Sequence, residues 1–245
     1  MQTIICMKWG SRYGSKYVNR LYKSIKRHTK KYTKVYCFTD NVLGINQNII
    51  CKPLPRISLP DEISYTPWRK MSLWQYPLYD LEGDVLFLDL DLVITGNLDR
   101  FFDFKRGSYC VIENWTQMEQ NIGNTSCFRF PVGKYNSIFE KFEQNPRKYW
   151  KRYHIEQIYI SDQIKNQVFW PKEWCQSFKH NLLPNWPFRI WQPAKLPKET
   201  SIVAFTGKPD PEDVINGKWP VKNSQIYKKI YKQLKTPQWV LDNWL

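Results

Sequence analysis

Two aspartates interrupt an otherwise apolar run near the middle of the chain. The run reads Val85-Leu86-Phe87-Leu88-Asp89-Leu90-Asp91-Leu92-Val93-Ile94. A buried carboxylate is costly unless it is paired or bound to a cation, and residues two apart on an extended chain point to the same side. Two such carboxylates suit Mg²⁺ or Mn²⁺ bridged to substrate phosphates. The alternative is a turn after the strand, where backbone amides or an arginine satisfy both acids.

The segments around this pair indicate an α/β sheet. Residues 3–7 and 34–38 are short apolar runs typical of strands, and residues 15–31 repeat apolar and basic positions at helical spacing. This β-loop-α-β order opens a doubly wound sheet. The unbroken apolar run at 84–88 predicts a central strand covered on both faces. Open sheets of this kind bind ligands beyond the carboxyl ends of their strands, where the two aspartates stand.

The rest of the chain predicts one domain with a small extension. Residues 51–67 carry four prolines and indicate a loop. Further strands are expected over 109–112 and 201–205, and further helices over 68–79, 135–142, 155–166 and 224–235. A length of 245 residues suits a catalytic domain over 1–220 and a basic amphipathic helical extension over 221–245.

Composition bears on partners and location. The net charge is +15, and the first 39 residues hold ten Lys or Arg and no acid. Nucleic acid, an anionic membrane and an anionic substrate are therefore all candidate partners. Six scattered cysteines without a Cys-x-x-Cys pair argue against a zinc site or a disulfide framework. No run approaches the ~20 apolar residues of a membrane span, and the N-terminus lacks signal-peptide features. The expected location is cytoplasmic, with a peripheral place on the inner face of the membrane as an option.

The aspartate segment resembles a known family. Phe87-Leu88-Asp89-Leu90-Asp91, followed by Ile94-Thr95-Gly96-Asn97-Leu98-Asp99, is similar to the metal-binding segment of GT-A glycosyltransferases, above all family 8 and the lipopolysaccharide sugar transferases of bacteria and phages. Supporting segments match in order: Lys8-Trp9-Gly10 with Tyr17-Val18-Asn19, Cys37-Phe38-Thr39-Asp40, Trp68-Arg69-Lys70-Met71, Ser161-Asp162-Gln163 and Phe205-Thr206-Gly207-Lys208-Pro209. The resemblance implies the GT-A (Rossmann-like) fold, a mixed, mostly parallel sheet flanked by helices.

The resemblance also implies roles for single residues. Asp89 and Asp91 would hold Mn²⁺ or Mg²⁺, and Asp162 and Gln163 would face the reacting sugar as catalytic residues. Asp40 would contact the base. The full nucleotide-sugar site would comprise Lys8, Trp9, Gly10, Tyr13, Tyr17, Asp40, Lys70, Leu90, Gly207 and Lys208.

Each role has a structural alternative. Lys8 and Lys70 would otherwise be surface lysines, and Asp40 a turn residue. Asp162 would be a helix N-cap after Ser161. Residues 207–209 would be a plain turn.

The sequence departs from the family at one position. Related enzymes commonly read Phe-His-Gly-Lys-Pro in the last segment, and that His is the third protein ligand to the metal. This chain has Thr206 there, and none of His28, His154 and His180 occupies a matching position. The metal would then be held by two carboxylates, phosphate oxygens and water, which Mg²⁺ accepts readily.

The predicted function is metal-assisted transfer of a sugar from a nucleoside-diphosphate sugar, a UDP-sugar foremost, to a hydroxyl of a glycan or lipid-linked glycan. One alternative is a phage-type DNA glycosyltransferase, which the positive charge favours. Another is a nucleic-acid-binding protein without catalysis, which leaves the aspartate pair unexplained. The basic helices would also suit an anionic membrane surface. The sequence identifies no general base.

Overall fold

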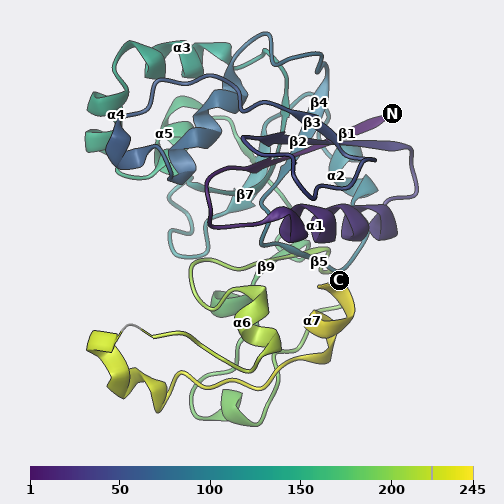
Figure 1. Cartoon of the computed structure of the whole chain (residues 1–245), viewed down its shortest axis with the longest axis vertical. Coiled ribbons are helices and arrows are strands. Elements are labelled where there is room, and N and C mark those ends of the chain that lie inside the picture. The colour runs from purple at the N-terminus through teal and green to yellow at the C-terminus, as the bar shows by residue number, and fades with distance from the viewer. Residues whose placement is uncertain (222, 245) are drawn as a thin grey trace. The chain divides into compact units, whose positions relative to one another are not determined.

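The computed structural model describes residues 1–221 and 223–244, which form two compact units (Figure 1). Unit 1 comprises Met1–Asn19, Lys30–Leu90 and Asp99–Trp170. Unit 2 comprises Arg20–Thr29, Asp91–Leu98 and Pro171–Leu245. Helix α1 (Ser15–His28) contributes its first residues to unit 1 and the others to unit 2.

Unit 1 is built on a seven-stranded sheet with the order β3-β2-β1-β4-β7-β6-β8. Its strands are β1 (Gln2–Lys8), β2 (Thr33–Thr39), β3 (Ile50–Lys52), β4 (Asp84–Leu88), β6 (Cys110–Glu113), β7 (Gly123–Pro131) and β8 (Val168–Phe169). Only β7 runs antiparallel to its neighbours β4 and β6, among pairs that are otherwise parallel. The expectation of a mixed, mostly parallel sheet with β4 at its centre is confirmed.

The aromatic core of unit 1 lies between the sheet and four helical segments. These are η2 (Pro67–Trp74), α3 (Asn136–Gln144), α4 (Pro146–Tyr153) and α5 (Glu156–Gln163). Trp68 stacks on Phe142 with ring centroids 5.3 Å apart, and Trp74 stacks on Phe128 at 5.8 Å. The helix expected over 68–79 is instead a 3₁₀ helix that ends at Trp74. It ends there because Pro77 disfavours helical backbone in the residue before it.

Strand β7 has no counterpart among the predicted elements. Its apolar pattern is broken by Arg129, whose side chain is nevertheless fully buried. The guanidinium donates to the backbone carbonyls of Phe101 and Lys105, both at 2.5 Å, and lies 3.5 Å from Asp84. These partners satisfy the charge inside the sheet, so a basic residue occupies a core position that patterning assigns to apolar side chains.

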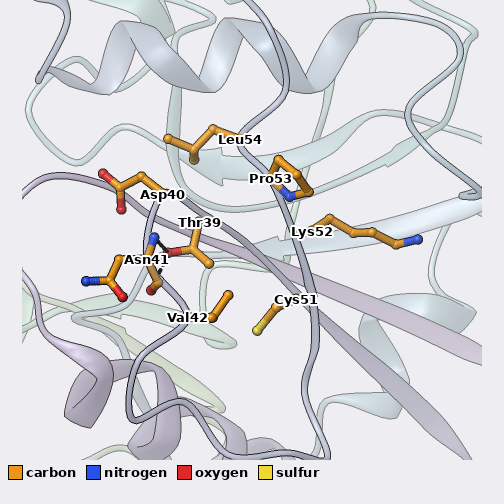
Figure 2. Close-up of a pocket in the computed structure, with 8 residues that line it drawn as sticks. All are labelled: Thr39, Asp40, Asn41, Val42, Cys51, Lys52, Pro53 and Leu54. Atoms are coloured by element: carbon orange, nitrogen blue, oxygen red, sulfur yellow. Dashed lines mark hydrogen bonds between the residues drawn. The ribbon is translucent and has the colours of Figure 1, made fainter.

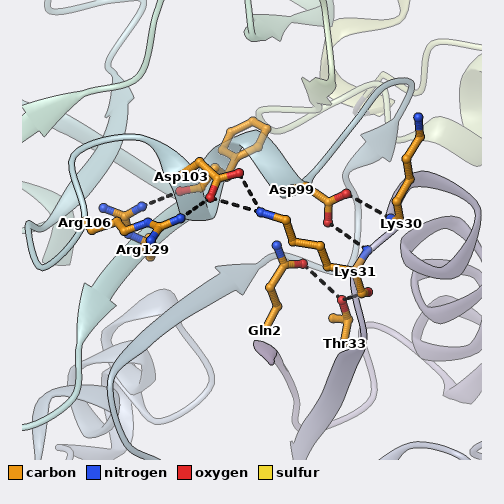
Figure 3. A network of polar contacts seen from close by, with 9 residues as sticks. Gln2, Lys30, Lys31, Thr33, Asp99, Asp103, Arg106 and Arg129 are labelled. Atoms are coloured by element: carbon orange, nitrogen blue, oxygen red, sulfur yellow. Dashed lines mark hydrogen bonds and ion pairs between the residues drawn. The ribbon is translucent and has the colours of Figure 1, made fainter.

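Asp99 belongs to a structural network in unit 1 (Figure 3). It begins helix α2 (Asp99–Asp103), is 6% exposed, and accepts from the backbone N–H of Lys30 at 2.9 Å. Lys31 reaches Asp103 at 2.8 Å. Asp99 thus fixes the turn that precedes β2.

Unit 2 has its own three-stranded sheet, in the order β5-β10-β9. Its strands are β5 (Val93–Ile94), β9 (Cys175–Ser177) and β10 (Ile202–Ala204), and its short helices are η3 (Phe178–Leu182), η4 (Phe188–Ile190), α6 (Pro211–Ile215), η5 (Asn223–Lys229) and α7 (Gln238–Asn243). Phe178 stacks on Phe205 at 4.8 Å behind this sheet. The strand expected over 201–205 is confirmed.

The α-helix expected over 224–235 is wrong in type. The chain forms the 3₁₀ segment η5, which kinks at Gln225, and then a β-bridge between Lys218 and Gln233. Lysines four apart repel one another on a helix, and the segment offers no acid to offset them. Residues 222 and 245 of the expected extension lie outside the described residues. Within the described chain, no helix combines the length and apolarity needed to cross a membrane.

Candidate functional site

Two residues at and just after the end of β1 contact Asp40, which directly follows β2. Lys8, the last residue of β1, has its Nζ 3.7 Å from Asp40 Oδ1 and 3.2 Å from the carbonyl of Asn41. The backbone N–H of Gly10 donates to Asp40 Oδ2 at 2.8 Å. Gly10 has φ +61°, which glycine adopts at little cost. The chain therefore brings together Lys8, Gly10 and Asp40, which the sequence singled out separately.

A cavity of about 580 Å³ opens beside Asp40 at the carboxyl ends of β2 and β3. Figure 2 shows that its lining comes from two segments, residues 39–42 and 51–54. Asp40 supplies charge, and Val42, Pro53 and Leu54 supply apolar surface. The Lys52 ammonium pairs with Asp80, at 3.2 Å, outside the lining. Such a mixture suits a flat, partly polar ring system.

The loop after β1 adds aromatic and basic side chains. Tyr13 and Tyr17 are half-buried, with ring centroids 4.7 Å apart, and the Arg12 guanidinium lies 4.9 Å from the centre of the Tyr13 ring. Trp9 packs on the core of unit 1. Burial lowers the pKa of the Arg69 guanidinium. The neighbouring Asp40 and Tyr65 oppose this effect but are weaker, so the net pKa is lowered.

Asp89 follows β4 directly and is held by a buried lysine. Lys70 is 4% exposed; its Nζ donates to Asp89 Oδ2 at 2.8 Å and to the carbonyl of Thr125 at 2.9 Å. The backbone N–H of Asp89 donates to the carbonyl of Ser126 at 2.9 Å. The alternative that Lys70 is an ordinary surface lysine is therefore wrong.

This cluster extends to a carboxyl group that the sequence reading missed. Glu156 is 3% exposed, and its Oε1 accepts from the Thr125 hydroxyl at 2.7 Å. Glu156 begins α5, and an acid at a helix start is ordinarily explained by the helix dipole alone. The Lys70–Asp89 cluster, defined as Lys70, Asp89, Thr125 and Glu156, thus has two carboxyl groups and one ammonium.

Asp162 and Gln163 lie at the other end of α5. Asp162 accepts from Lys165 Nζ at 2.6 Å and from the Tyr153 hydroxyl, and these hydrogen bonds, that of Lys165 first, lower its pKa. Gln163 accepts from Lys141 at 2.7 Å. The N-cap of α5 is Ile155, so the N-cap alternative for Asp162 is wrong. A catalytic role for this pair stays a prediction.

The remaining expected residues belong to unit 2, except Leu90, which is buried at the edge of unit 1. Lys208 Nζ lies 2.6 Å from Asp210 Oδ2 and 3.0 Å from Asp213 Oδ2. Burial lowers the Lys208 pKa, but these two hydrogen bonds outweigh it and the net pKa is raised. Gly207 has φ +75°, and a Cβ added there would meet open space.

The donor chemistry of the two aspartates fits a divalent cation. Lys70 occupies Oδ2 of Asp89, and no hydrogen bond from the described residues reaches Oδ1. Asp91 follows two residues later and is half-buried. In unit 2 the Thr206 hydroxyl is buried and has no partner among the described residues. Among all the residues that the structure describes, no three His, Cys, Asp or Glu side chains lie together as a group that could ligate a metal. Carboxylate and hydroxyl oxygens are hard donors, and Mg²⁺ accepts donors of this kind together with water and phosphate.

Comparison with solved structures identifies the fold. The galactosyltransferase LgtC, in complex with donor and acceptor sugar analogs, matches with a TM-score of 0.57 and 12% identity over 86% of this chain and 89% of its own. The glycosyltransferase GlyE of Streptococcus pneumoniae TIGR4 matches with a TM-score of 0.60 and 15% identity, over 99% of this chain and 63% of GlyE. The bifunctional glycosyltransferase WbbM matches with a TM-score of 0.55 and 12% identity, over 86% of this chain and 46% of WbbM.

Scans of protein families and of curated proteins find no match. At the identities found, the structural likeness is evidence of fold rather than of activity. The chain therefore has the fold of GT-A-type glycosyltransferases similar to bacterial sugar transferases, as the resemblance implied.

Proposed function

We propose that this protein transfers a sugar from a nucleoside-diphosphate sugar to a hydroxyl acceptor. The observation that carries the proposal is the Lys70–Asp89 cluster, which lies at the carboxyl end of the central strand of a GT-A-type sheet. Buried ionisable groups at a strand end are a functional-site signature because they cost folding energy. The shared fold and the complex of LgtC with donor and acceptor sugar analogs support a sugar donor and a sugar acceptor.

The donor nucleoside is assigned to the cavity beside Asp40. Its volume of about 580 Å³ lies within the range of small-molecule sites. Asp40 is held by Gly10 and Lys8 and offers a carboxylate to the N–H groups of a base or the hydroxyls of a ribose. Tyr13 and Tyr17, from the loop after β1, would line the nucleotide.

A divalent cation is part of the proposal. Asp89 and Asp91 would hold Mg²⁺ in preference to Mn²⁺, because the position of the expected imidazole ligand carries Thr206. When bound, such a cation neutralises charge that develops on a departing diphosphate. Lys208 would add a second cation there, and its bonds to Asp210 and Asp213 would have to be exchanged for bonds to phosphate.

Lys70 would stabilise negative charge on the donor. Lys70 is fixed by Asp89 and by the carbonyl of Thr125, so its ammonium has few alternative positions. A preorganised ammonium stabilises negative charge without reorganisation at the moment of reaction. The acceptor hydroxyl would attack the anomeric carbon, and the bond from that carbon to the diphosphate oxygen would break. The nucleoside diphosphate takes the bonding electron pair, and the proton of the acceptor hydroxyl passes to a diphosphate oxygen or to water.

A thermal-shift screen and a sugar-nucleotide hydrolysis assay test this proposal. One UDP-, GDP- or other nucleoside-diphosphate sugar should raise the melting temperature in the presence of Mg²⁺ and be hydrolysed slowly, and EDTA should remove both effects. Asp91→Asn should lower turnover by about 10²-fold or more, because several kcal/mol of charge stabilisation are lost.

Asp103→Asn is the matched control, since it also removes one carboxylate, from the ion pairs with Lys31 and Arg106. It should leave turnover unchanged. Full turnover by the Asp91→Asn protein, or an absence of any response to all sugar nucleotides, would contradict the proposal. Acceptor assays with glycans, lipid-linked glycans and hydroxymethylated DNA then separate a glycan transferase from a DNA-modifying one.

A further inference from the structure

One short segment of unit 2 exposes an unusual density of apolar side chains. Among the six residues 186–191, Trp186, Phe188 and Trp191 are each 51–52% exposed, and Ile190 is 36% exposed. The rings of Phe188 and Trp191 lie edge to face, with centroids 6.0 Å apart. Water-exposed aromatic clusters of this kind mark interaction surfaces, because their burial against a partner releases free energy.

A lysine-rich segment is attached to this aromatic cluster. The Arg189 side chain donates to the carbonyl of Tyr231 at 2.5 and 3.1 Å, and the backbone N–H of Lys235 donates to the carbonyl of Arg189 at 2.9 Å. Two cations lie near the indole ring of Trp219, Arg189 at 5.1 Å and Lys232 at 5.2 Å from its centre. Residues 186–191, 218–221 and 223–235 therefore form one joined surface in unit 2, here named the aromatic–lysine surface.

The charge of this surface has one sign. Residues 218–221 and 223–235 contain five lysines and no acid, and residues 186–191 contain Arg189 and no acid. Burial and then the neighbouring charges of Lys228, Lys179 and Arg189 lower the pKa of Lys232. Like charges kept this close raise the free energy of the isolated protein, and an anionic partner relieves that repulsion.

We infer that the aromatic–lysine surface docks on an anionic lipid bilayer, with residues 186–191 entering the interface and the described lysines of this surface contacting the headgroups. Trp and Phe favour the boundary between headgroups and acyl chains, and lysines beside them bind anionic lipid. The aliphatic side chains decide between bilayer and nucleic acid. Ile230 is 70% exposed, and an aliphatic chain gains by entering hydrocarbon, whereas single-stranded nucleic acid gains from stacking on rings.

This inference does not require the proposed function. Docking on a bilayer would bring the protein to a lipid-linked acceptor without a membrane-spanning helix, and the described residues contain no such helix. Sugar transfer and membrane docking are separately measurable, so the failure of one leaves the other standing.

Vesicle co-sedimentation tests the inference on the full chain. Vesicles of equal parts phosphatidylcholine and phosphatidylglycerol should bind the protein at about 0.05 M salt and release most of it at about 0.5 M, because salt screens exposed charges. Phe188→Ser combined with Trp191→Ser should weaken binding about tenfold. Lys228→Glu combined with Lys232→Glu should weaken it about thirtyfold or more.

Two matched variants control for loss of charge and of aromatic surface. Lys16→Glu with Lys23→Glu makes the same charge change on exposed residues of α1, and Tyr32→Ser removes a ring that is 70% exposed in unit 1. Neither should change vesicle binding, and urea unfolding verifies that every variant is folded.

Several results would overturn the inference. It fails if the protein does not bind anionic vesicles at low salt, or binds pure phosphatidylcholine equally well. It also fails if the aromatic double substitution leaves vesicle binding intact and abolishes binding of single-stranded DNA or of a soluble oligosaccharide, which would assign the surface to that ligand.

Discussion

Removing the Lys70 ammonium should destabilise unit 1 measurably. Breaking a fully buried ion pair by deleting one partner costs about 3–5 kcal/mol. The Lys70 side chain is 5% exposed, but that of Asp89 is 21% exposed, so water reaches the charge left behind. We therefore expect Lys70→Met to lower the free energy of unfolding by about 2–3 kcal/mol, including the lost hydrogen bond to Thr125.

A double-mutant cycle isolates the interaction from the loss of packing. Lys70→Met, Asp89→Asn and the combined variant are compared by urea unfolding, and the coupling energy between the two residues should be about 2 kcal/mol. The exposed pair Lys165 and Asp162 is the control, because its atoms are also close, at 2.6 Å, while its side chains are 71% and 37% exposed. Its coupling should stay below about 1 kcal/mol.

The same cycle distinguishes a functional cluster from a structural one. If Lys70 steadies charge on the donor, Lys70→Met should reduce turnover more than it reduces donor affinity, since the ammonium acts most strongly on charge that develops during reaction. A coupling energy no larger than that of the exposed pair, with unchanged turnover, would refute the reasoning that Lys70 is a buried, preorganised cation.

Three further outcomes are expected. Gly10→Ala should destabilise the protein and weaken nucleotide binding more than Gly107→Ala does. Both glycines have positive φ, but only a Cβ at Gly10 would meet a neighbour, the Tyr65 ring at 2.9 Å. Equal losses for the two variants in urea unfolding and in nucleotide titration would exclude the steric cause. Arg129→Met should lower the free energy of unfolding by about 3 kcal/mol, since it removes a fully buried guanidinium and leaves the carbonyls of Phe101 and Lys105 without its hydrogen bonds. A loss under about 1 kcal/mol, the range of an exposed ion pair, would contradict this. Burial, partly offset by a hydrogen bond with Asn243, lowers the pKa of His28 below 6.5. The stability it contributes is therefore present above pH ~6.5 and lost as pH falls through the folded pKa, so His28→Asn should flatten that pH dependence in thermal melts.

Much of the sheet was predictable because its strands carry continuous apolar sequence. Residues 3–7, 34–38 and 84–88 lie within β1, β2 and β4, and the ladder between β1 and β2 runs from Gln2 to Lys8. The C-terminal lysines were harder to interpret. Amphipathic spacing predicts an α-helix there, but periodicity reports only where side chains would point if a helix formed, and it does not weigh repulsion between neighbouring charges.

The residues that the sequence reading missed around Asp89 were missed for a topological reason. The rule that ligands gather at carboxyl ends of strands holds for parallel neighbours, but β4 pairs with antiparallel β7, with Leu88 opposite Cys127. Asp89 therefore meets residues that precede Cys127, and its N–H bonds the carbonyl of Ser126. Thr125 lies in the amino-terminal half of β7, where sequence reasoning expects no site, and its hydroxyl connects the cluster to Glu156 at the start of α5. An antiparallel strand inserted beside the central strand thus links Lys70 and Glu156 through the carbonyl and the hydroxyl of Thr125, a link that no spacing rule along the chain would have predicted.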